Sequence, residues 1–144
     1  MASCLEVIPE SDNQIAHYNE LVMPRSKGGI KISEDTTTLL SNDQVDEFAA
    51  PYLAKVLDHF GGGYVHYCGK NPHLFDIVMQ LPLAYCLNLG NPEKHYMVDI
   101  LQRCRQSGKV YYGSIPQGQD ETLRQHFQKL LSASRADNRS ILLL

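Results

Sequence analysis

A histidine and a cysteine stand two residues apart at the end of a β-type run, in the sequence His66-Tyr67-Cys68. Side chains two residues apart in an extended strand point to the same face, so His66 and Cys68 can project together. An imidazole nitrogen and a thiolate are both ligands that zinc favours. Catalytic zinc usually keeps three protein ligands and one open position, so this pair alone would make an incomplete site.

Two further polar positions follow strand-like runs and are candidates for substrate binding. Asp35 lies in the loop after the first strand of the regular pattern, where its carboxylate would accept hydrogen bonds from a substrate or from a zinc-ligating imidazole. Asn88 lies near the end of a later strand. The alternative for Asp35 is a solvated loop in which its side chain bonds to the local backbone.

The cysteines also have a simpler interpretation. A buried cysteine behaves as a small hydrophobic residue, and a nearby histidine can bond to a neighbouring loop instead of a metal. Cys86 and Cys104 follow Cys68 at equal intervals of eighteen residues, but one is expected in mid-strand and the other late in a helix. We therefore assign Cys86 and Cys104 to the core. The four cysteines lack the compact spacing of a disulfide scaffold, so reduced thiols are expected.

A regular alternation of strands and helices must position these residues. Strands are predicted at 29–33, 64–67, 84–89, 110–113 and 140–144. The first helix has a capping-box start at Ser41 and Gln44 and seven apolar residues at helical spacing: Val45, Phe48, Ala49, Tyr52, Leu53, Val56 and Leu57.

Three more helices follow. Asn71-Pro72 opens one that ends near Gln80, and Asn91-Pro92 caps one that ends at Ser107-Gly108. Asp120 opens the last, which carries Leu123, Phe127, Leu130 and Leu131. Residues 1–28 form a weakly organised segment in which 11–23 could make a short helix, and 29–144 form the main domain.

Composition excludes several classes of protein. With 43% hydrophobic and 20% charged residues, the 144-residue chain is ordinary for a globular protein with a real core. A net charge of −3 argues against a nucleic-acid partner. No apolar run approaches the roughly 20 residues that span a bilayer, so we expect no membrane partner and a cytoplasmic location.

Strands that alternate with helices predict an α/β protein with a parallel sheet. Two architectures fit: an open doubly wound sheet, or part of a (β/α)₈ barrel. The apolar ending Ile141-Leu142-Leu143-Leu144 looks cut off, and five strands would be somewhat more than half of a barrel. A fragment or a split form of a barrel is therefore one hypothesis.

Four segments carry a resemblance to a known family: Ile32-Ser33-Glu34-Asp35, Pro51-Tyr52-Leu53, Gly63-Tyr64-Val65-His66-Tyr67-Cys68-Gly69 and Asn88-Leu89-Gly90-Asn91-Pro92-Glu93. Over residues 29–144 the chain resembles the C-terminal half of the uroporphyrinogen decarboxylase superfamily, which includes cobalamin-dependent methyltransferases that act on thiols. The resemblance implies the C-terminal portion of a (β/α)₈ TIM barrel, with the active site at the carboxyl ends of its strands.

In the methyltransferase branch the zinc motif is His-x-Cys followed much later by another cysteine. His66 and Cys68 match the first two positions. The third has no match, because the chain contains no cysteine after Cys104. The decarboxylase branch relies on arginine and aspartate positions of the N-terminal half and on a histidine beyond the last strand, none of which can be carried over. The His-x-Cys pair would not be needed for decarboxylation.

From this resemblance we expect zinc-dependent methyl transfer to a small-molecule thiol, with the methyl group on a corrinoid that a partner protein carries. The alternatives are uroporphyrinogen decarboxylase activity in porphyrin (haem) biosynthesis, or a catalytically silent fragment or half-barrel. Because part of a barrel exposes strand edges, we also expect self-association or pairing with an N-terminal half-barrel.

Overall fold

The computed structural model describes residues 14–16, 22–24 and 29–134, and the regular elements in them alternate between strand and helix. The strands are β1 Gln14–Ala16, β2 Val22–Pro24, β3 Ile30–Ser33, β4 Gly63–Tyr67, β5 Ala84–Leu89 and β6 Val110–Tyr111. The helical elements are η2 Thr36–Leu39, α2 Asn42–Gln44, η3 Val45–Ala49, α3 Ala50–His59, α4 Pro72–Gln80, η4 Pro92–Lys94, α5 Met97–Gln106 and α6 Leu123–Ser134.

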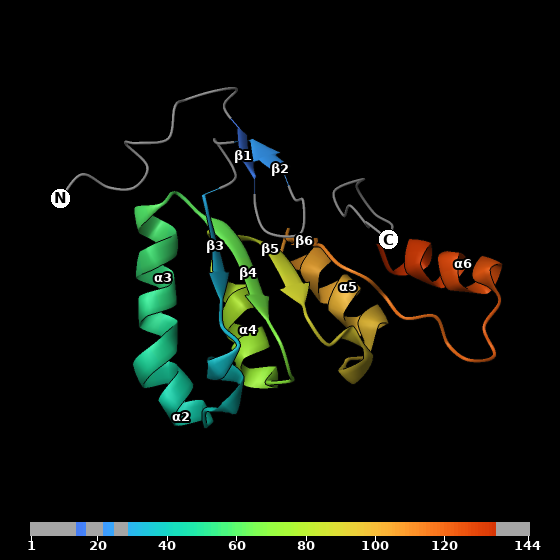
Figure 1. Ribbon diagram of the computed structural model, residues 1–144, viewed down its shortest axis with the longest axis horizontal. Helices are drawn as coiled ribbons and strands as arrows, with labels where there is room; N and C mark the ends of the chain where they lie inside the picture. The colour runs from blue at the N-terminus through green and yellow to red at the C-terminus, as the bar shows by residue number, and fades with distance from the viewer. Residues whose placement is uncertain (1–13, 17–21, 25–28, 135–144) are drawn as a thin grey trace.

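The main sheet has four strands in the order β3-β4-β5-β6, and all three neighbouring pairs are parallel (Figure 1). Ser33 lies opposite His66, and His66 lies opposite Asn88. Since the carboxyl ends of parallel strands meet at one edge of the sheet, this register brings the loops after β3, β4 and β5 together.

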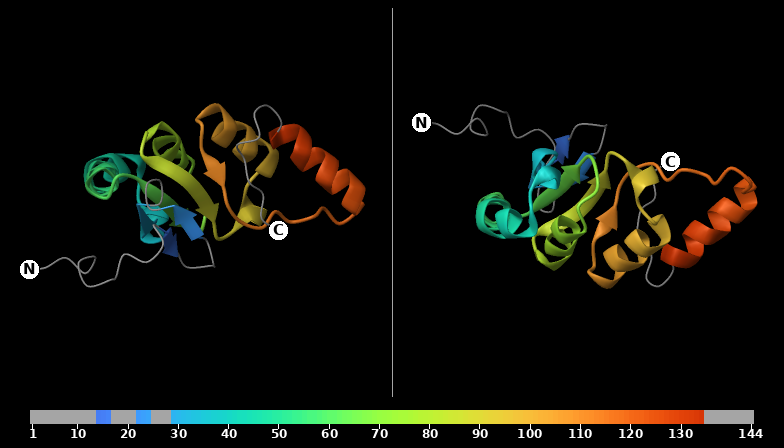
Figure 2. Two further views of the ribbon diagram at one scale, coloured as in Figure 1. Left: turned by 90° about the horizontal axis from the view of Figure 1, so that it is seen from above. Right: turned by 90° about the horizontal axis from the view of Figure 1, so that it is seen from below.

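The helices lie on one face of this sheet. Each strand lies beside the next one in the chain, so every crossover moves in the same direction, and right-handed crossovers then leave their helices on the same side. Figure 2 shows α3, α4 and α5 along one side of the sheet. A doubly wound sheet would reverse its strand order and carry helices on both faces. The described part is thus an α/β fold compatible with a segment of a barrel; the strand predicted at 140–144 lies outside the described residues.

The hydrophobic core fills the space between the sheet and these helices. Alternate strand residues Val65, Tyr67, Leu87, Leu89 and Tyr111 are buried in it together with helix residues that include Leu53, Leu57, Leu74, Val78, Leu101 and Cys104. Cys86 is also buried, so the prediction that Cys86 and Cys104 serve packing is confirmed. His66 and Asn88 alternate with the core residues and face the other side of the sheet.

The first predicted helix forms, but its start differs from a regular α-helix. The capping box is present, with the Ser41 side chain accepting from the Gln44 backbone and the Gln44 side chain accepting from the Ser41 backbone. A π turn then covers Val45–Ala49, and the backbone N–H of Ala50 bonds to Val45. Pro51 explains the turn, because it has no N–H to donate and its ring crowds the preceding turn.

Two predicted helix starts are wrong by a few residues. Asn91-Pro92 opens only the short 3₁₀ helix η4, and α5 begins at Met97. The Asn91 side chain caps neither helix; it accepts from the backbone N–H of Gly69 (2.9 Å) and donates to Glu93. At the last helix Thr122, not Asp120, makes the capping contacts, because its hydroxyl accepts from the backbone N–H of Gln125.

The helix suggested for 11–23 is also wrong where the structure describes it. Residues 14–16 and 22–24 are antiparallel strands paired through Ile15 and Met23. Cross-strand pairing here overrides a weak local helix propensity. The remaining residues of that stretch lie outside the described part of the chain.

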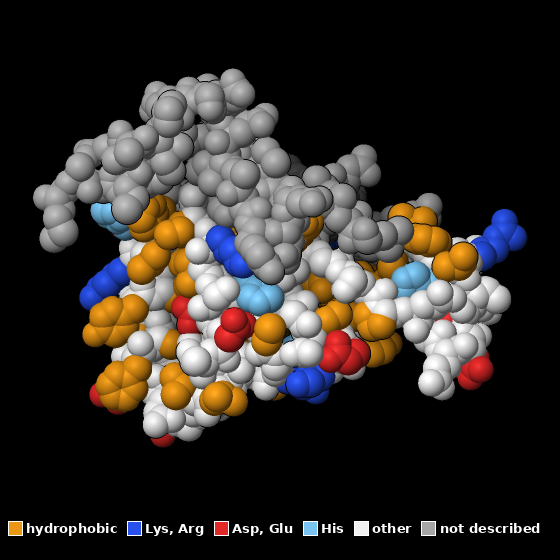
Figure 3. Space-filling view, viewed as in Figure 1, with side chains coloured by type: hydrophobic (Ala, Val, Ile, Leu, Met, Phe, Trp, Pro, Cys, Tyr) orange, Lys and Arg blue, Asp and Glu red, His pale blue; other side chains and the backbone are white. Residues whose placement is uncertain are grey.

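Apolar side chains also lie on the surface of the two end helices. Figure 3 shows hydrophobic groups along the outer side of α3 and along α6, at opposite ends of the molecule. The exposed large hydrophobic residues are Leu39, Phe48, Tyr52, Val56, Tyr96, Leu123, Phe127 and Leu131. Within the described ranges, no helix combines the length and the apolar character needed to cross a bilayer.

Candidate metal centre

The candidate site lies at the carboxyl ends of β3, β4 and β5. His66 is the second-last residue of β4, Cys68 follows that strand, and Asp35 lies in the loop between β3 and η2. Their potential ligand atoms, one each of nitrogen, sulfur and oxygen, lie within 4.8 Å of one another. Among the residues that the structure describes, this is the one such group of three.

Short contacts connect the three side chains. His66 Nε2 is 3.6 Å from Cys68 Sγ and 3.5 Å from Asp35 Oδ1. Asp35 Oδ1 also accepts a hydrogen bond of 2.6 Å from the backbone N–H of Cys68. The Asp35 carboxylate is therefore held against the end of β4 by the strand that carries the other two ligands.

The loop that carries Asp35 is itself ordered by local hydrogen bonds. The hydroxyl of Thr38 donates to the Asp35 carbonyl (2.7 Å), and the hydroxyl of Thr37 donates to the Glu34 carboxylate. The backbone N–H of Glu34 bonds to the His66 carbonyl (2.8 Å), which extends the β3–β4 pairing by one bond. Asp35 thus projects from a fixed turn.

Asn88 sets the orientation of the His66 ring. Its Oδ1 lies 2.5 Å from His66 Nδ1, and its Nδ2 donates to the backbone carbonyl of Tyr112. Because the amide nitrogen is committed to that carbonyl, the oxygen faces the ring and Nδ1 must carry the proton. In the neutral ring His66 Nε2 then carries the lone pair, and this nitrogen faces Cys68 and Asp35, as a metal-ligating histidine requires.

Two glycines leave room around the cysteine. A Cβ at Gly90, in the loop after β5, would overlap Cys68 Sγ and lie 3.2 Å from the His66 ring. Gly69 has φ +91°, a left-handed conformation that favours glycine and turns the chain away immediately after Cys68. The loops of β4 and β5 therefore pack closely around the sulfur.

The site has a protonated thiol next to a carboxylate when no cation is bound. Desolvation raises the pKa of Cys68 above its ordinary value, and the charge and hydrogen bond of Asp35 raise it further, while Lys94 lowers it. The His66 side chain is 15% exposed and that of Asp35 is 48% exposed, so the group is reachable from solvent. A bound cation would displace the thiol proton and compensate the carboxylate charge.

The donor set fits zinc. Nitrogen, sulfur and oxygen are the three ligand types that zinc binds in proteins, and three protein ligands with one open position are the usual catalytic arrangement. Of the predicted substrate-binding residues, Asp35 lies among the candidate ligands and Asn88 contacts His66. The sequence did not predict that Asn88 would orient the His66 ring. The signal was present, because His66 and Asn88 are each the second-last residue of a strand, in β4 and β5.

Comparisons with models of protein families, with curated proteins and with solved structures give no match to the chain. The resemblance to the uroporphyrinogen decarboxylase superfamily therefore stays a prediction. The positions of Asp35, His66 and Cys68 alone indicate a metal centre.

Proposed function

We propose that Asp35, His66 and Cys68 hold a zinc ion and that the chain acts on a thiol substrate. The observation that carries the proposal is the contact between Asn88 Oδ1 and His66 Nδ1, because it leaves Nε2 as the ring nitrogen that faces the two other donor atoms. A histidine serving only as a loop hydrogen-bond donor would not need a second element to fix its ring. When bound, zinc would keep a substrate thiol as a nucleophilic thiolate at neutral pH.

The residues of the chain have separate tasks in this proposal. Cys68 gives up its proton and binds as thiolate, and His66 binds through Nε2. Asp35 supplies the third donor, and its hydrogen bond from the Cys68 backbone fixes the distance between the two. Gly90 keeps the loop after β5 clear of the sulfur.

The finer proposal is methyl transfer to a small-molecule thiol from a corrinoid carried by a partner protein. It is supported by the match of His66 and Cys68 to the first two positions of the methyltransferase motif, with Asp35 as a third donor in a chain that has no later cysteine. Replacing one thiolate ligand with a carboxylate lowers the number of sulfur donors but leaves the formal charge of the ligand set unchanged. Zinc therefore remains the expected metal. Decarboxylation would use none of these three side chains as metal ligands.

The test is a methyl-transfer assay with the zinc-loaded chain, methylcobalamin as donor and a panel of low-molecular-weight thiols as acceptors. We expect S-methylated product that is lost on chelation and in Cys68→Ser. Cys86→Ala, which alters a buried cysteine outside the group of candidate ligands, is the control and should keep activity. Stoichiometric zinc without any thiol methylation would support the silent alternative, and chelator-resistant release of CO₂ from uroporphyrinogen would support the decarboxylase.

A further inference from the structure

The helices at the two ends of the sheet each carry a stripe of exposed apolar side chains. Along η3 and α3 the stripe is Phe48, Tyr52 and Val56, which are 60%, 59% and 37% exposed. Along α6 it is Leu123, Phe127 and Leu131, which are 63%, 38% and 54% exposed. Residues four apart lie on one face of a helix, so each set forms a continuous strip.

These strips are additional to the faces that build the core. The inner face of the first helix buries Val45, Ala49, Leu53 and Leu57, and α6 buries Leu130 and Ala133 against the rest of the molecule. Each end helix is therefore apolar on two faces. Exposed apolar patches of this kind mark surfaces that bind a partner.

The strip on α3 borders a groove beside the outermost strand β3. The groove has a volume of about 190 Å³ and is lined by residues from β3, its following loop and α3, among them Ile32, Leu40, Tyr52 and Leu53. In a parallel sheet whose helices all lie on one face, each helix packs beside the helix that precedes it in the chain. At the edge strand β3, that preceding helix would occupy the space next to β3 and α3. The groove thus has the position of a missing neighbour that resembles α6.

We propose that the partner is a second copy of this chain, with the β6–α6 end of one copy docked on the β3–α3 end of the other. The described residues of each copy hold four sequentially ordered parallel strands, and two copies give eight, the number that closes a (β/α)₈ barrel; the closed dimer therefore requires that residues 140–144 add no fifth strand to it. Closure by two identical seams generates a two-fold dimer without leaving an edge. In such a barrel α6 lies beside the partner's first helix and parallel to it, so the two strips would run in the same direction.

Charge on the two end helices favours this pairing over contact of like ends. Residues 41–60 contain four acidic side chains, Asp43, Asp46, Glu47 and Asp58, and one lysine, Lys55. Residues 123–134 contain Arg124 and Lys129 and no acidic residue. Two first helices in contact would repel each other, whereas α6, with Arg124 and with Lys129 paired to Glu121, adds no acidic surplus to the contact.

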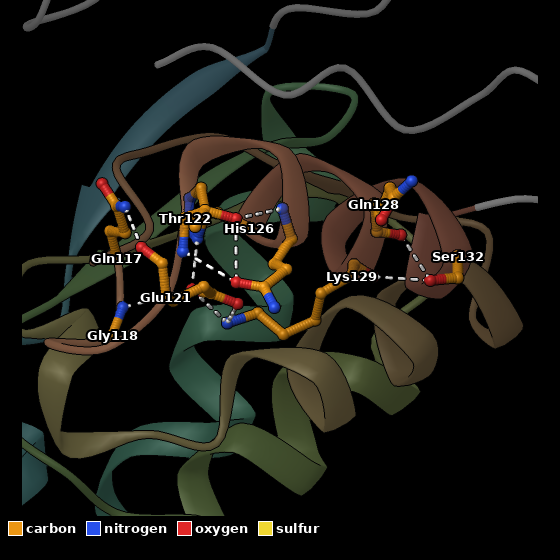
Figure 4. Close-up of polar contacts among 9 residues, drawn as sticks. Gln117, Gly118, Glu121, Thr122, His126, Gln128, Lys129 and Ser132 are labelled. Carbon is orange, nitrogen blue, oxygen red and sulfur yellow. Dashed lines mark hydrogen bonds and ion pairs between the residues drawn. The ribbon is translucent and has the colours of Figure 1, made fainter.

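The strip on α6 is held in a fixed direction by a polar cluster at the start of that helix. Figure 4 shows the Glu121 carboxylate accepting hydrogen bonds from His126, Lys129 and the backbone N–H of Gly118. His126 is 3% exposed, so its contact with Glu121 anchors the inner face of α6. Leu123 and Phe127 therefore keep pointing outward.

Sedimentation equilibrium of the full chain and of two variants tests the proposal. The wild type should sediment at twice the chain mass of 16.2 kDa at micromolar concentration. Tyr52→Asp on one strip and Phe127→Asp on the other should each be monomeric. Tyr96→Asp makes the same change at a residue that is 74% exposed but lies on neither strip, and it should stay dimeric. Far-UV circular dichroism checks that each variant is folded, and Phe48→Asp and Leu123→Asp provide a second pair.

Mixing the two variants distinguishes a head-to-tail seam from other modes of association. The Tyr52→Asp chain keeps an intact α6 strip and the Phe127→Asp chain keeps an intact α3 strip, so an equimolar mixture should form dimers that neither forms alone. A monomeric wild type, or dissociation by only one of the two variants, would overturn the proposal. So would a mixture without dimers. These readouts do not involve metal, so they are independent of the proposed zinc function.

Discussion

At the scale of single residues, the site depends on which atoms of His66 and Cys68 are left available. Asn88 takes the Nδ1 side of the ring and Gly90 leaves the space that the sulfur occupies. Neither residue would bind the metal itself. Both are placed by the loop and strand of β5, so the centre needs this neighbouring strand as well as the two segments that supply ligands.

Gly90→Ala tests the space requirement. The added methyl group would overlap Cys68 Sγ, so the sulfur must move away from His66 and Asp35. We expect a loss of zinc affinity on the order of tenfold, which corresponds to about 1.4 kcal/mol. Isothermal titration with zinc measures it. Gly118→Ala, where an added Cβ meets its nearest neighbour at an ordinary 3.4 Å, is the control and should bind as the wild type does.

Asn88→Ala tests the tautomer argument. Without the amide oxygen, His66 Nδ1 loses its acceptor and the ring is free to rotate or change tautomer. Substitution of such a supporting residue typically weakens metal binding about 10- to 100-fold, and we expect a loss in this range by the same titration. Unchanged affinity would show that His66 does not bind through an Asn88-oriented Nε2.

The three described cysteines should differ in reactivity. Burial raises the pKa of both Cys86 and Cys104 to about 12, so these thiols stay protonated and inaccessible at pH 8. Cys68 is exposed. Iodoacetamide followed by peptide mass spectrometry should therefore label Cys68 in the folded chain, and Cys86 and Cys104 only after denaturation. Zinc should protect Cys68; labelling that zinc leaves unchanged would count against its role as a ligand.

At the scale of elements, periodicity and capping signals were sufficient to predict the strands of the main sheet and the helices that connect them. The start of α5 was wrong because Asn91 forms a contact that only the folded chain reveals. The start of α6 was wrong because Asp120 was chosen as the cap, although Thr122 and Gln125 have the sequence spacing of a capping box and form one. Asn91 has the sequence pattern of a cap, but its side chain joins the β5 loop to Gly69 of the β4 loop. Local pattern alone cannot distinguish a cap from a contact between loops.

The anchor of α6 should be sensitive to acid. Hydrogen bonds from Lys129, and then from Gly118 and His126, lower the pKa of Glu121 from its ordinary value of 4.5 to about 2. A carboxylate with a lowered pKa in the folded state stabilises the protein above pH 4.5, and this contribution is lost as the pH falls toward 2. Urea unfolding of wild type and Glu121→Gln should therefore differ at pH 6 and converge toward pH 2.

The neighbouring Asp120→Asn removes a carboxylate outside this cluster and serves as the control for the acid experiment. It should follow the wild-type pH dependence. A constant difference between wild type and Glu121→Gln at all pH values would instead assign the effect to packing of the side chain.

At the scale of the whole molecule, the α/β class and the parallel sheet were predicted and are confirmed, and the sequential strand order of the described part is compatible with a barrel segment. His66 and Cys68 could be found from strand periodicity because they are two residues apart. Asp35 as a third donor could not, since it is 31 residues from His66 in sequence and meets it only through the β3–β4 register. The sequence shows that the first helix and the last helix each carry more apolar residues than one buried face needs. Which of these residues are buried depends on packing, so the outer strips could not be assigned from the sequence.

Zinc should stabilise the whole fold, because its ligands come from the β3 loop and from β4. At a free zinc concentration 100 times the Kd, a ligand that binds only the folded state adds about 2.7 kcal/mol to the free energy of unfolding. Urea unfolding with and without zinc measures this for the wild type. Cys68→Ser should show a smaller increase, and an equal increase in both would place the zinc elsewhere.

Cobalt(II) titration of the chain tests the metal centre most directly, because its absorption spectrum reports both the ligand types and their number. We predict one cobalt per chain, a thiolate-to-cobalt charge-transfer band that disappears in Cys68→Ser, and visible bands of four-coordinate cobalt that change in Asp35→Asn and His66→Ala. Zinc should displace the cobalt. A charge-transfer band that persists in Cys68→Ser, or a chain that binds no cobalt, would contradict a metal centre formed by Asp35, His66 and Cys68.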